Sequence, residues 1–214
     1  MTQCYLFIRI SVISILVEIR ILSIIPLWSD QEISSKLAAR KLRKINIDNI
    51  GRAAVLIPIW KEHESLFFLL TLRTKKVQTH KGQISFPGGM RDSMEEPLVQ
   101  TALRETQEEI GIPGNQIRIL GQFDEYLSTT KLIVTPFVGR IEPPLVIQKN
   151  PEEVEEVLKI PVSLFQKPEL LRTEIRQRLN QRITIYHYDF KGLDVWGLTA
   201  QIIRDFLKVI DPKA

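Results

Sequence analysis

Short apolar runs separated by polar turns follow one another from Ala53 onward, and they predict a series of β-strands. The first run, AAVLIPIW, is separated from the second, LFFLLTLR, by the polar turn KEHES. A long loop is expected from Thr74 to Gln83, before the sequence ISFPGG. Strands are predicted at residues 53–60, 66–73, 117–123, 132–139 and 182–189.

Apolar residues at helical spacing predict helices between and around these strands. The first is a short amphipathic helix within residues 29–50, based on Leu37, Ala38, Leu42 and Ile45. The second runs from Glu96 to Ile110, with Pro97 suited to a first helical position and Gly111 to the C-terminal stop. Two more are predicted at Glu152–Leu158 and Leu198–Val209. Strands mixed with helices predict an α/β (α+β) fold in which helices cover a sheet.

The first 28 residues are far more apolar than the rest, but Arg9, Glu18 and Arg20 interrupt them. A bilayer span needs about 20 mostly apolar residues, and each central charge costs roughly 2.5–3.5 kcal/mol, so a transmembrane helix is disfavoured. A signal peptide fits poorly, because no basic cluster precedes the stretch and no small-residue cleavage site follows it. Three interpretations stay open: membrane contact through residues 4–28, extra structure packed on the domain, or a start codon assigned too early.

Length and composition fit one globular domain, which is expected at residues 29–214. The net charge of +4 suits an anionic substrate, and no run of Lys or Arg predicts binding to nucleic acid. The single cysteine, Cys4, excludes an internal disulfide and a Cys-based zinc site. The expected location is therefore the cytoplasm, with membrane association if residues 4–28 act as an anchor.

Three carboxylates on one predicted helix carry the strongest chemical signal. Residues three and four apart share a helix face, so Glu105, Glu108 and Glu109 are expected to point the same way. Like charges this close repel one another, but Mg²⁺ and Mn²⁺ prefer oxygen ligands and would make the cluster favourable.

A solvated acidic helix face is the alternative, and for the REXXEE spacing alone it is the better interpretation. Two neighbouring features favour a metal site instead. Arg104 precedes Glu108 by four residues and can pair with it, which organises the acidic face. The upstream FPGG sequence makes a tight turn into the start of the helix, where anions bind easily.

The segment from Gly88 to Ile112 resembles the Nudix box, the signature of the Nudix hydrolases, written G-x5-E-x7-R-E-U-x-E-E-x-G-U with U a bulky aliphatic residue. The residues that match are Gly89, Glu95, Arg104-Glu105, Glu108-Glu109, Gly111 and Ile112. Two positions depart: eight residues instead of seven separate Glu95 from Arg104, and Thr106 replaces an aliphatic residue. The resemblance implies a Nudix-like α/β/α sandwich with a mixed sheet between helices.

The preceding sequence, LLTLRTKKVQTHKGQISFPGG, is similar to the motif of the coenzyme A pyrophosphatase branch of this family, roughly LLTxR(S/A)xxxRxxxGxxxFPGG. The matching residues are Leu69, Leu70, Thr71, Arg73, Gly82, Phe86, Pro87, Gly88 and Gly89. Thr74 and Gln78 depart from it, and the one-residue insertion in the box is also associated with this branch. The similarity implies cleavage of coenzyme A or acyl-CoA to 3′,5′-ADP and (acyl-)4′-phosphopantetheine.

The resemblance also implies roles for individual residues. Glu105 and Glu109 would bind Mg²⁺ or Mn²⁺, while Glu108 would be a further ligand or would orient or deprotonate the attacking water. Arg104 would hold these carboxylates in place. Four residues are assigned to substrate binding: Arg73, Lys81, Gly88 and Gly89.

Other residues have weaker claims. Glu125 follows a predicted strand and is a minor candidate for the metal site, whereas His187 and Trp196 are expected to pack. Ser85 has no His/Asp context, which argues against a nucleophilic serine.

Alternative functions stay open: hydrolysis of a dinucleotide, NADH or sugar nucleotide, a non-catalytic nucleotide-binding module, or a membrane-associated scaffold. The expected partner is a small nucleotide, and the sequence does not determine the oligomeric state.

Overall fold

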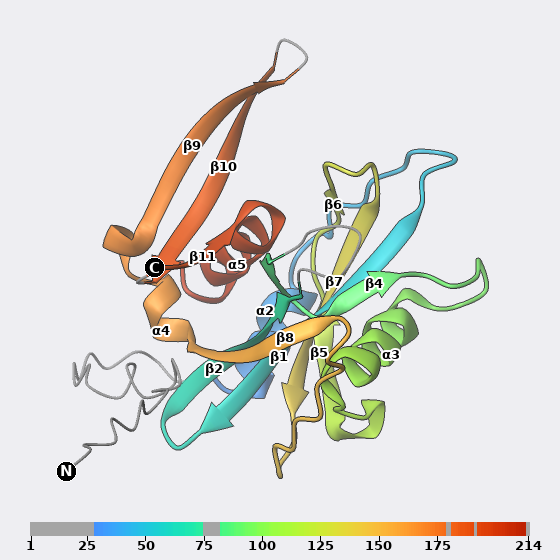
Figure 1. Ribbon diagram of the computed structural model, residues 1–214, viewed down its shortest axis with the longest axis vertical. Coiled ribbons are helices and arrows are strands. Elements are labelled where there is room, and N and C mark those ends of the chain that lie inside the picture. The colour runs from blue at the N-terminus through green and yellow to red at the C-terminus, as the bar shows by residue number, and fades with distance from the viewer. Residues whose placement is uncertain (1–27, 75–81, 179–180, 191, 213–214) are drawn as a thin grey trace, which may run out of the picture.

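The computed structural model describes residues 28–74, 82–178, 181–190 and 192–212 (Figure 1). The helices are α2 (Asp30–Ala38), α3 (Leu98–Ile110), α4 (Val162–Phe165) and α5 (Gly197–Ile210), with 3-10 turns η2 (Gly114–Gln116) and η3 (Pro168–Leu170). The strands are β1 (Arg52–Glu62), β2 (Ser65–Arg73), β3 (Ile84–Ser85), β4 (Gly88–Met90), β5 (Ile117–Gln122), β6 (Tyr126–Leu127), β7 (Ile133–Ile141), β8 (Val154–Pro161), β9 (Leu171–Arg178), β10 (Gln181–Phe190) and β11 (Leu193–Trp196). The five strands predicted from the sequence correspond to β1, β2, β5, β7 and β10.

The main sheet is mixed, as predicted. Its central order is β3-β2-β1-β7-β5, while β4 pairs with β1, β6 with β7 and β8 with β2. Strands β1 and β7 run parallel, and the other pairs are antiparallel. Two strands that are far apart in the sequence therefore lie side by side at the centre of the sheet, where β7 is buried along its whole length.

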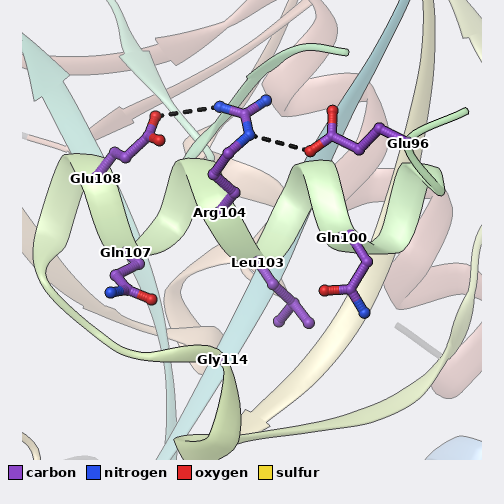
Figure 2. Close-up of a pocket in the computed structure, with 7 residues that line it drawn as sticks. All are labelled: Glu96, Gln100, Leu103, Arg104, Gln107, Glu108 and Gly114. Atoms are coloured by element: carbon purple, nitrogen blue, oxygen red, sulfur yellow. Dashed lines mark hydrogen bonds and ion pairs between the residues drawn. The ribbon is translucent and has the colours of Figure 1, made fainter. Parts of the chain in front are cut away.

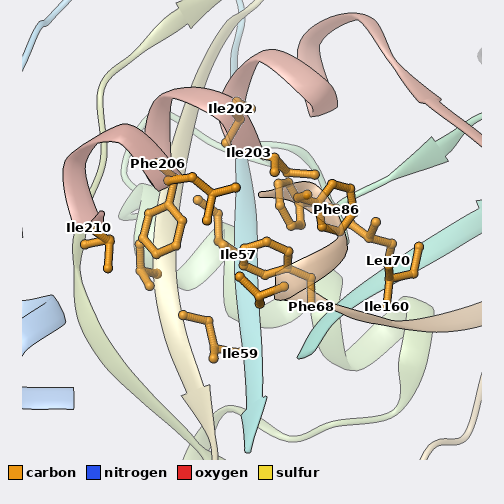
Figure 3. Close-up of a cluster of buried hydrophobic side chains, with 14 of the residues drawn as sticks. Ile57, Ile59, Phe68, Leu70, Phe86, Ile160, Ile202, Ile203, Phe206 and Ile210 are labelled. Carbon is orange, nitrogen blue, oxygen red and sulfur yellow. The ribbon is translucent and has the colours of Figure 1, made fainter. Parts of the chain in front are cut away.

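Alternate residues of β1 pack on opposite faces of this sheet. Ile57 and Ile59 join a core cluster with α5, including Phe206, as Figure 3 shows. Ala54 and Leu56 join a second cluster with residues of α3, such as Ala102 and Ile110. Because successive strand side chains point to opposite faces, β1 carries an apolar surface for a helical layer on each side. The α/β/α sandwich expected from the sequence is thereby confirmed.

A second sheet, in the order β11-β10-β9, extends away from the main sheet (Figure 1). Strands β9 and β11 were not predicted, because they are short or strongly polar and pair only with β10. His187 on β10 lies 2.8 Å from the Asp194 carboxylate through Nδ1 and stacks on Trp196. The expected packing of these two rings is therefore confirmed.

Two predicted helices differ from the structure. The helix at Glu152–Leu158 is wrong, since this segment enters strand β8, which pairs with the edge of β2. Val154 and Val157 suit a strand once β2 is available to pair with, and this tertiary pairing overrides the helical spacing. Helix α2 begins at Asp30 behind a Ser29–Glu32 capping box and ends at Ala38, so Leu42 and Ile45 lie beyond it.

The predicted N-terminal extension falls almost entirely outside the described residues. Its last residue, Trp28, is buried in the core cluster of α5 and α2. Among the described residues, no helix is long and apolar enough to cross a membrane.

The attachment of α5 gives a stability test. Phe206 is fully buried, and its ring packs edge-on against Phe68 and Phe123 at centroid distances of 6.0 Å. We expect Phe206→Ala to lower the free energy of unfolding by about 3–5 kcal/mol, measured by urea titration. Ile175→Ala is the control, because Ile175 is 67% exposed on β9 and should change stability by less than about 0.5 kcal/mol. Equal effects of the two substitutions would contradict this account of the core.

Candidate active site

Helix α3, which carries the acidic residues, packs on one face of the sheet against β1, β4 and β7. Its inner side carries Ala102, Thr106 and Ile110, all buried. Thr106 stands where the family motif has an aliphatic residue, and its hydroxyl donates to the Ala102 carbonyl at 2.6 Å. This bond satisfies the polar group in the core, so threonine is tolerated there. Pro97 precedes the first helical residue, and Gly111 ends the helix with a left-handed φ of 75°.

Arg104 is the centre of a network of ion pairs on α3 (Figure 2). Its Nη1 donates to Glu105 Oε1 at 2.8 Å and to Glu108 Oε2 at 3.1 Å. Its Nη2 donates to the Met90 carbonyl of β4 at 3.1 Å. The predicted pairing of Arg104 with Glu108 is confirmed, and the same side chain ties the helix to the glycine-containing strand.

Arg104 also pairs with Asp92 and, more closely, with Glu96, which the sequence interpretation missed. Arg104 Nε donates to Glu96 Oε1 at 3.0 Å, and this bond is the main reason that the pKa of Glu96 falls to about 2. Glu95 is exposed. The match of Glu95 to the box is therefore corrected: seven residues separate Glu96 from Arg104, and the extra residue lies in the loop after Gly89. The family spacing, applied backward from Arg104 with seven intervening residues, identifies Glu96 from the sequence.

Glu109 is buried beside Arg73 at the end of β2. Its side chain is 2% exposed, and Arg73 Nη1 donates to Oε1 at 3.1 Å. Burial is the main reason that the pKa of Glu109 rises to about 8, although the charge of Arg73 opposes the shift. The second oxygen, Oε2, is buried without a hydrogen bond of normal geometry among the described residues, although the nearby Gly88 N–H also acts to lower the pKa of this carboxyl. An unsatisfied carboxylate oxygen in this position suggests an acceptor for a ligand.

Gly89 on β4 provides the space in which Glu105 lies. A Cβ atom at Gly89 would be 2.4 Å from the carboxyl carbon of Glu105, which is too close for any other residue without displacing that side chain. Gly88 has a φ of 153°, and a Cβ there would meet the Ala54 carbonyl oxygen at 2.3 Å. Both glycines therefore allow β4 to run directly against α3 and β1. Burial raises the pKa of Glu105, while the hydrogen bond from Arg104 opposes the shift.

The donor set fits a hard divalent cation, because Glu105, Glu108 and Glu109 supply only carboxylate oxygens and Oε2 of Glu109 is unpartnered. Over the ranges that the structure describes, no three acidic or histidine side chains already converge as a metal-binding group. The two arginines explain this arrangement, since Arg104 binds Glu105 and Glu108 while Arg73 binds Glu109. Ligation of a cation would require these ion pairs to rearrange.

The other predicted site residues are distributed as follows. Gly88, Gly89 and Arg73 lie at the carboxylates, whereas Lys81 lies outside the described residues. Glu125 is used elsewhere: its Oε1 accepts from Arg52 at 2.9 Å and its Oε2 from the Ile45 backbone at 2.6 Å. Both oxygens of Glu125 are thus occupied in holding the segment before β1, which gives no support to a metal-binding role.

A hollow follows the outer side of α3, next to the carboxylates (Figure 2). Its lining combines the amides of Gln100 and Gln107 with the apolar side chain of Leu103 and reaches Arg104 and Glu108. Glu108 is 54% exposed and stands at the rim between the hollow and the ion-pair network. Among the three box glutamates, only Glu108 lines this hollow, while Glu109 is buried beside Arg73.

The chain matches the NUDIX domain family over residues 51–181. It is 35% identical over 163 residues to a protein of Photorhabdus laumondii called uncharacterized Nudix hydrolase NudL, covering 76% of this chain and 87% of that protein. The protein of the same name from Yersinia enterocolitica is 39% identical over 160 residues, with 73% of this chain and 80% of that protein covered.

A crystal structure of a MutT/nudix family protein from Enterococcus faecalis aligns with 86% of this chain and 70% of its own, at 17% identity and a TM-score of 0.47. The match to the NUDIX domain includes the main sheet, β1 to β8, and all of α3. The alignments with the two relatives cover most of the length of each relative. The chain therefore belongs to the Nudix family and is a hydrolase of nucleoside diphosphate derivatives.

Proposed function

We propose that this Nudix hydrolase cleaves the pyrophosphate bond of coenzyme A or acyl-CoA, giving 3′,5′-ADP and (acyl-)4′-phosphopantetheine. The observation that carries the proposal is that the coenzyme A motif and the Nudix box meet at one site. Arg73 belongs to the motif alone and binds Glu109 of the box, while Gly89, which the motif and the box share, lies against Glu105. The motif is thus tied to the hydrolytic carboxylates and is not a separate surface feature.

Other residues of the motif pack in the core or join β2 to β3 next to this site. Leu69, Leu70 and Phe86 are buried in the core. Thr71 donates through its hydroxyl to the Ser85 carbonyl at 3.3 Å and so joins β2 to β3. The residues on either side of the segment that the structure does not describe are therefore held in β2 and β3. We retain Arg73 and Lys81 as the cations that contact the anionic substrate.

We also infer that Glu105, Glu109 and Glu108 hold Mg²⁺ or Mn²⁺. The buried, unpartnered Oε2 of Glu109 and the all-oxygen donor set support this assignment. When bound, a divalent cation neutralises charge on the phosphate oxygens and makes phosphorus easier to attack. The protein holds these carboxylates near one another through Arg104, Arg73 and the space at Gly89, and the carboxylates would exchange their ion pairs with the arginines for the cation when it binds.

Glu108 is proposed to orient the attacking water and to accept its proton. The new bond forms between the water oxygen and one phosphorus, and the bond from that phosphorus to the bridging oxygen breaks. The bridging oxygen leaves with the bonding pair as part of the second phosphate. Glu108 suits this step because its carboxylate is exposed while Arg104 holds it through a single hydrogen bond.

The substrate assignment is tested by comparing purified protein on coenzyme A, acyl-CoA, NADH, ADP-ribose and a dinucleotide, each with Mg²⁺ and with Mn²⁺. We expect the highest kcat/KM with coenzyme A or acyl-CoA, and products that separate as 3′,5′-ADP and a 4′-phosphopantetheine. A strong preference for NADH or ADP-ribose would replace this proposal with the second candidate, a hydrolase of another nucleoside diphosphate derivative.

The role of Glu108 is tested by Glu108→Gln. We expect turnover to fall about 10²–10⁴-fold, because general base catalysis contributes on this order, with little change in unfolding midpoint. Glu64→Gln in the exposed turn between β1 and β2 is the matched control and should keep full activity. Unchanged turnover in Glu108→Gln would exclude this residue from the chemical step.

Glu96 and Glu95 are neighbours with different expected roles, so matched substitutions test which of them belongs to the box. Glu96→Gln removes the carboxylate that binds Arg104 Nε, so we expect turnover to fall at least about tenfold, as for a residue that orients catalytic groups. Glu95→Gln changes an exposed neighbour in the same way and should have no effect. Steady-state kinetics on both variants separates the two positions, and the reverse ranking would restore Glu95 to the box.

A further inference from the structure

Strand β9 has one edge without a partner strand among the described residues. It is the last strand in the order β11-β10-β9, and it pairs with β10 alone. In Figure 1 the β9–β10 hairpin extends away from the main sheet, with β9 as its outer strand. The backbone N–H and C=O groups along this edge are therefore available to another strand.

Several features that commonly protect an edge strand are missing from β9. Its sequence, LRTEIRQR, contains no proline, glycine or lysine. Its pairing with β10 runs from Leu171 to Arg178 without a register shift, so no bulge turns the edge away from a partner. The strand does carry charges, but they are of both signs. Such charges select a partner with a matching pattern instead of excluding every partner.

The two faces of β9 differ in character. Ile175 is 67% exposed, and it shares a face with the exposed residues Thr173 and Gln177. Glu174 and Arg176 lie on the other face, where Arg176 Nε donates to Glu174 Oε1 at 2.6 Å. Their side chains are 36% and 58% exposed, so both charges remain accessible to a second strand.

This pattern is complementary to itself when two copies of β9 run antiparallel. If the two-fold axis passes beside Ile175, each Glu174 lies opposite Arg176 of the second copy, and the two Ile175 side chains meet. Thr173 then lies opposite Gln177 of the second copy. A register centred on Glu174 or on Arg176 would instead set that charge opposite its own copy, which is unfavourable. The charges therefore favour one register and a two-fold symmetric partner.

We propose that β9 is a dimerisation edge, at which two copies of this chain pair antiparallel around Ile175 and join their second sheets into one continuous sheet. Exposed backbone groups supply the attraction, and Glu174 and Arg176 determine the partner and the register. The inference does not depend on the proposed substrate or metal, because β9 contributes no residue to the carboxylate site.

The test is sedimentation equilibrium of the full chain over a range of protein concentrations. We expect a reversible dimer with a Kd on the order of 10–100 µM, because one strand pair buries less surface than a standard interface. Glu174→Arg and Arg176→Glu, made singly, set like charges opposite each other twice per dimer, so each should raise the Kd about tenfold or more. Glu64→Arg, the same charge change in an exposed turn, is the matched control and should dimerise like wild type.

The charge pattern also predicts two recoveries. The double variant Glu174→Arg/Arg176→Glu restores opposite charges and should dimerise like wild type. A mixture of the two single variants should form a heterodimer for the same reason, although neither variant pairs well with itself. Circular dichroism and urea unfolding at low protein concentration show that each variant is folded, and we expect no change in the stability of the monomer.

Three results would contradict the proposal. A wild-type chain that stays monomeric well above this concentration range has no such dimer. Single charge variants that dimerise like wild type show that a different surface is used. Weakened single variants that recover neither in the double variant nor in the mixture exclude the pairing centred on Ile175.

Discussion

The burial of negative charge at the end of α3 is the constraint on which the site depends. A carboxylate such as Glu109, withdrawn from water, is stable only if positive groups or hydrogen-bond donors surround it. Arg73 supplies one such group from β2. The burial that raises the pKa of Glu109 to about 8 and the oxygen left without a partner show that this compensation is incomplete. The chain thus holds a group whose charge a further cation would stabilise.

On the more exposed side of the same helix, Arg104 compensates the negative charge of several carboxylates. It binds Glu96, Glu105 and Glu108 and also the backbone of β4, so one side chain sets the positions of three carboxylates and joins two elements. An arginine suits this role because its planar guanidinium offers several donors in fixed directions. The consequence is that the acidic side chains are pre-positioned, although they do not converge on one point.

The site also depends on a backbone arrangement that only glycine residues allow. Strand β4 lies between β1 and α3, and it approaches both only because Gly88 and Gly89 have no side chains. The parallel pairing of β1 with β7 makes the sheet continuous beneath this region. The site is therefore built on central, buried elements, which can hold catalytic groups more accurately than surface loops.

Several features of this protein were determined by the sequence alone. The spacing places Glu105, Glu108 and Glu109 within about one turn of the same helix, and Arg104 lies one turn from Glu108, because helical geometry is local. The expectation that the three glutamates point the same way holds only in part, since Glu109 is buried beside Arg73 and Glu108 is exposed. Short apolar runs likewise predicted five strands, and apolar residues at helical spacing predicted the helix α5. These predictions depend on neighbours within a few residues of one another, so they needed no knowledge of the rest of the chain.

Other features were decided only by the tertiary structure. Residues 152–158 have a helical pattern of apolar positions, but pairing with β2 makes their second part a strand. Glu96, and not Glu95, binds Arg104, because the inserted residue lies in the loop before it. The ion pair between Arg73 and Glu109 joins residues 36 positions apart in the sequence. Contacts of this kind depend on how distant strands pair and which groups they bury together, and no local pattern of residues encodes that.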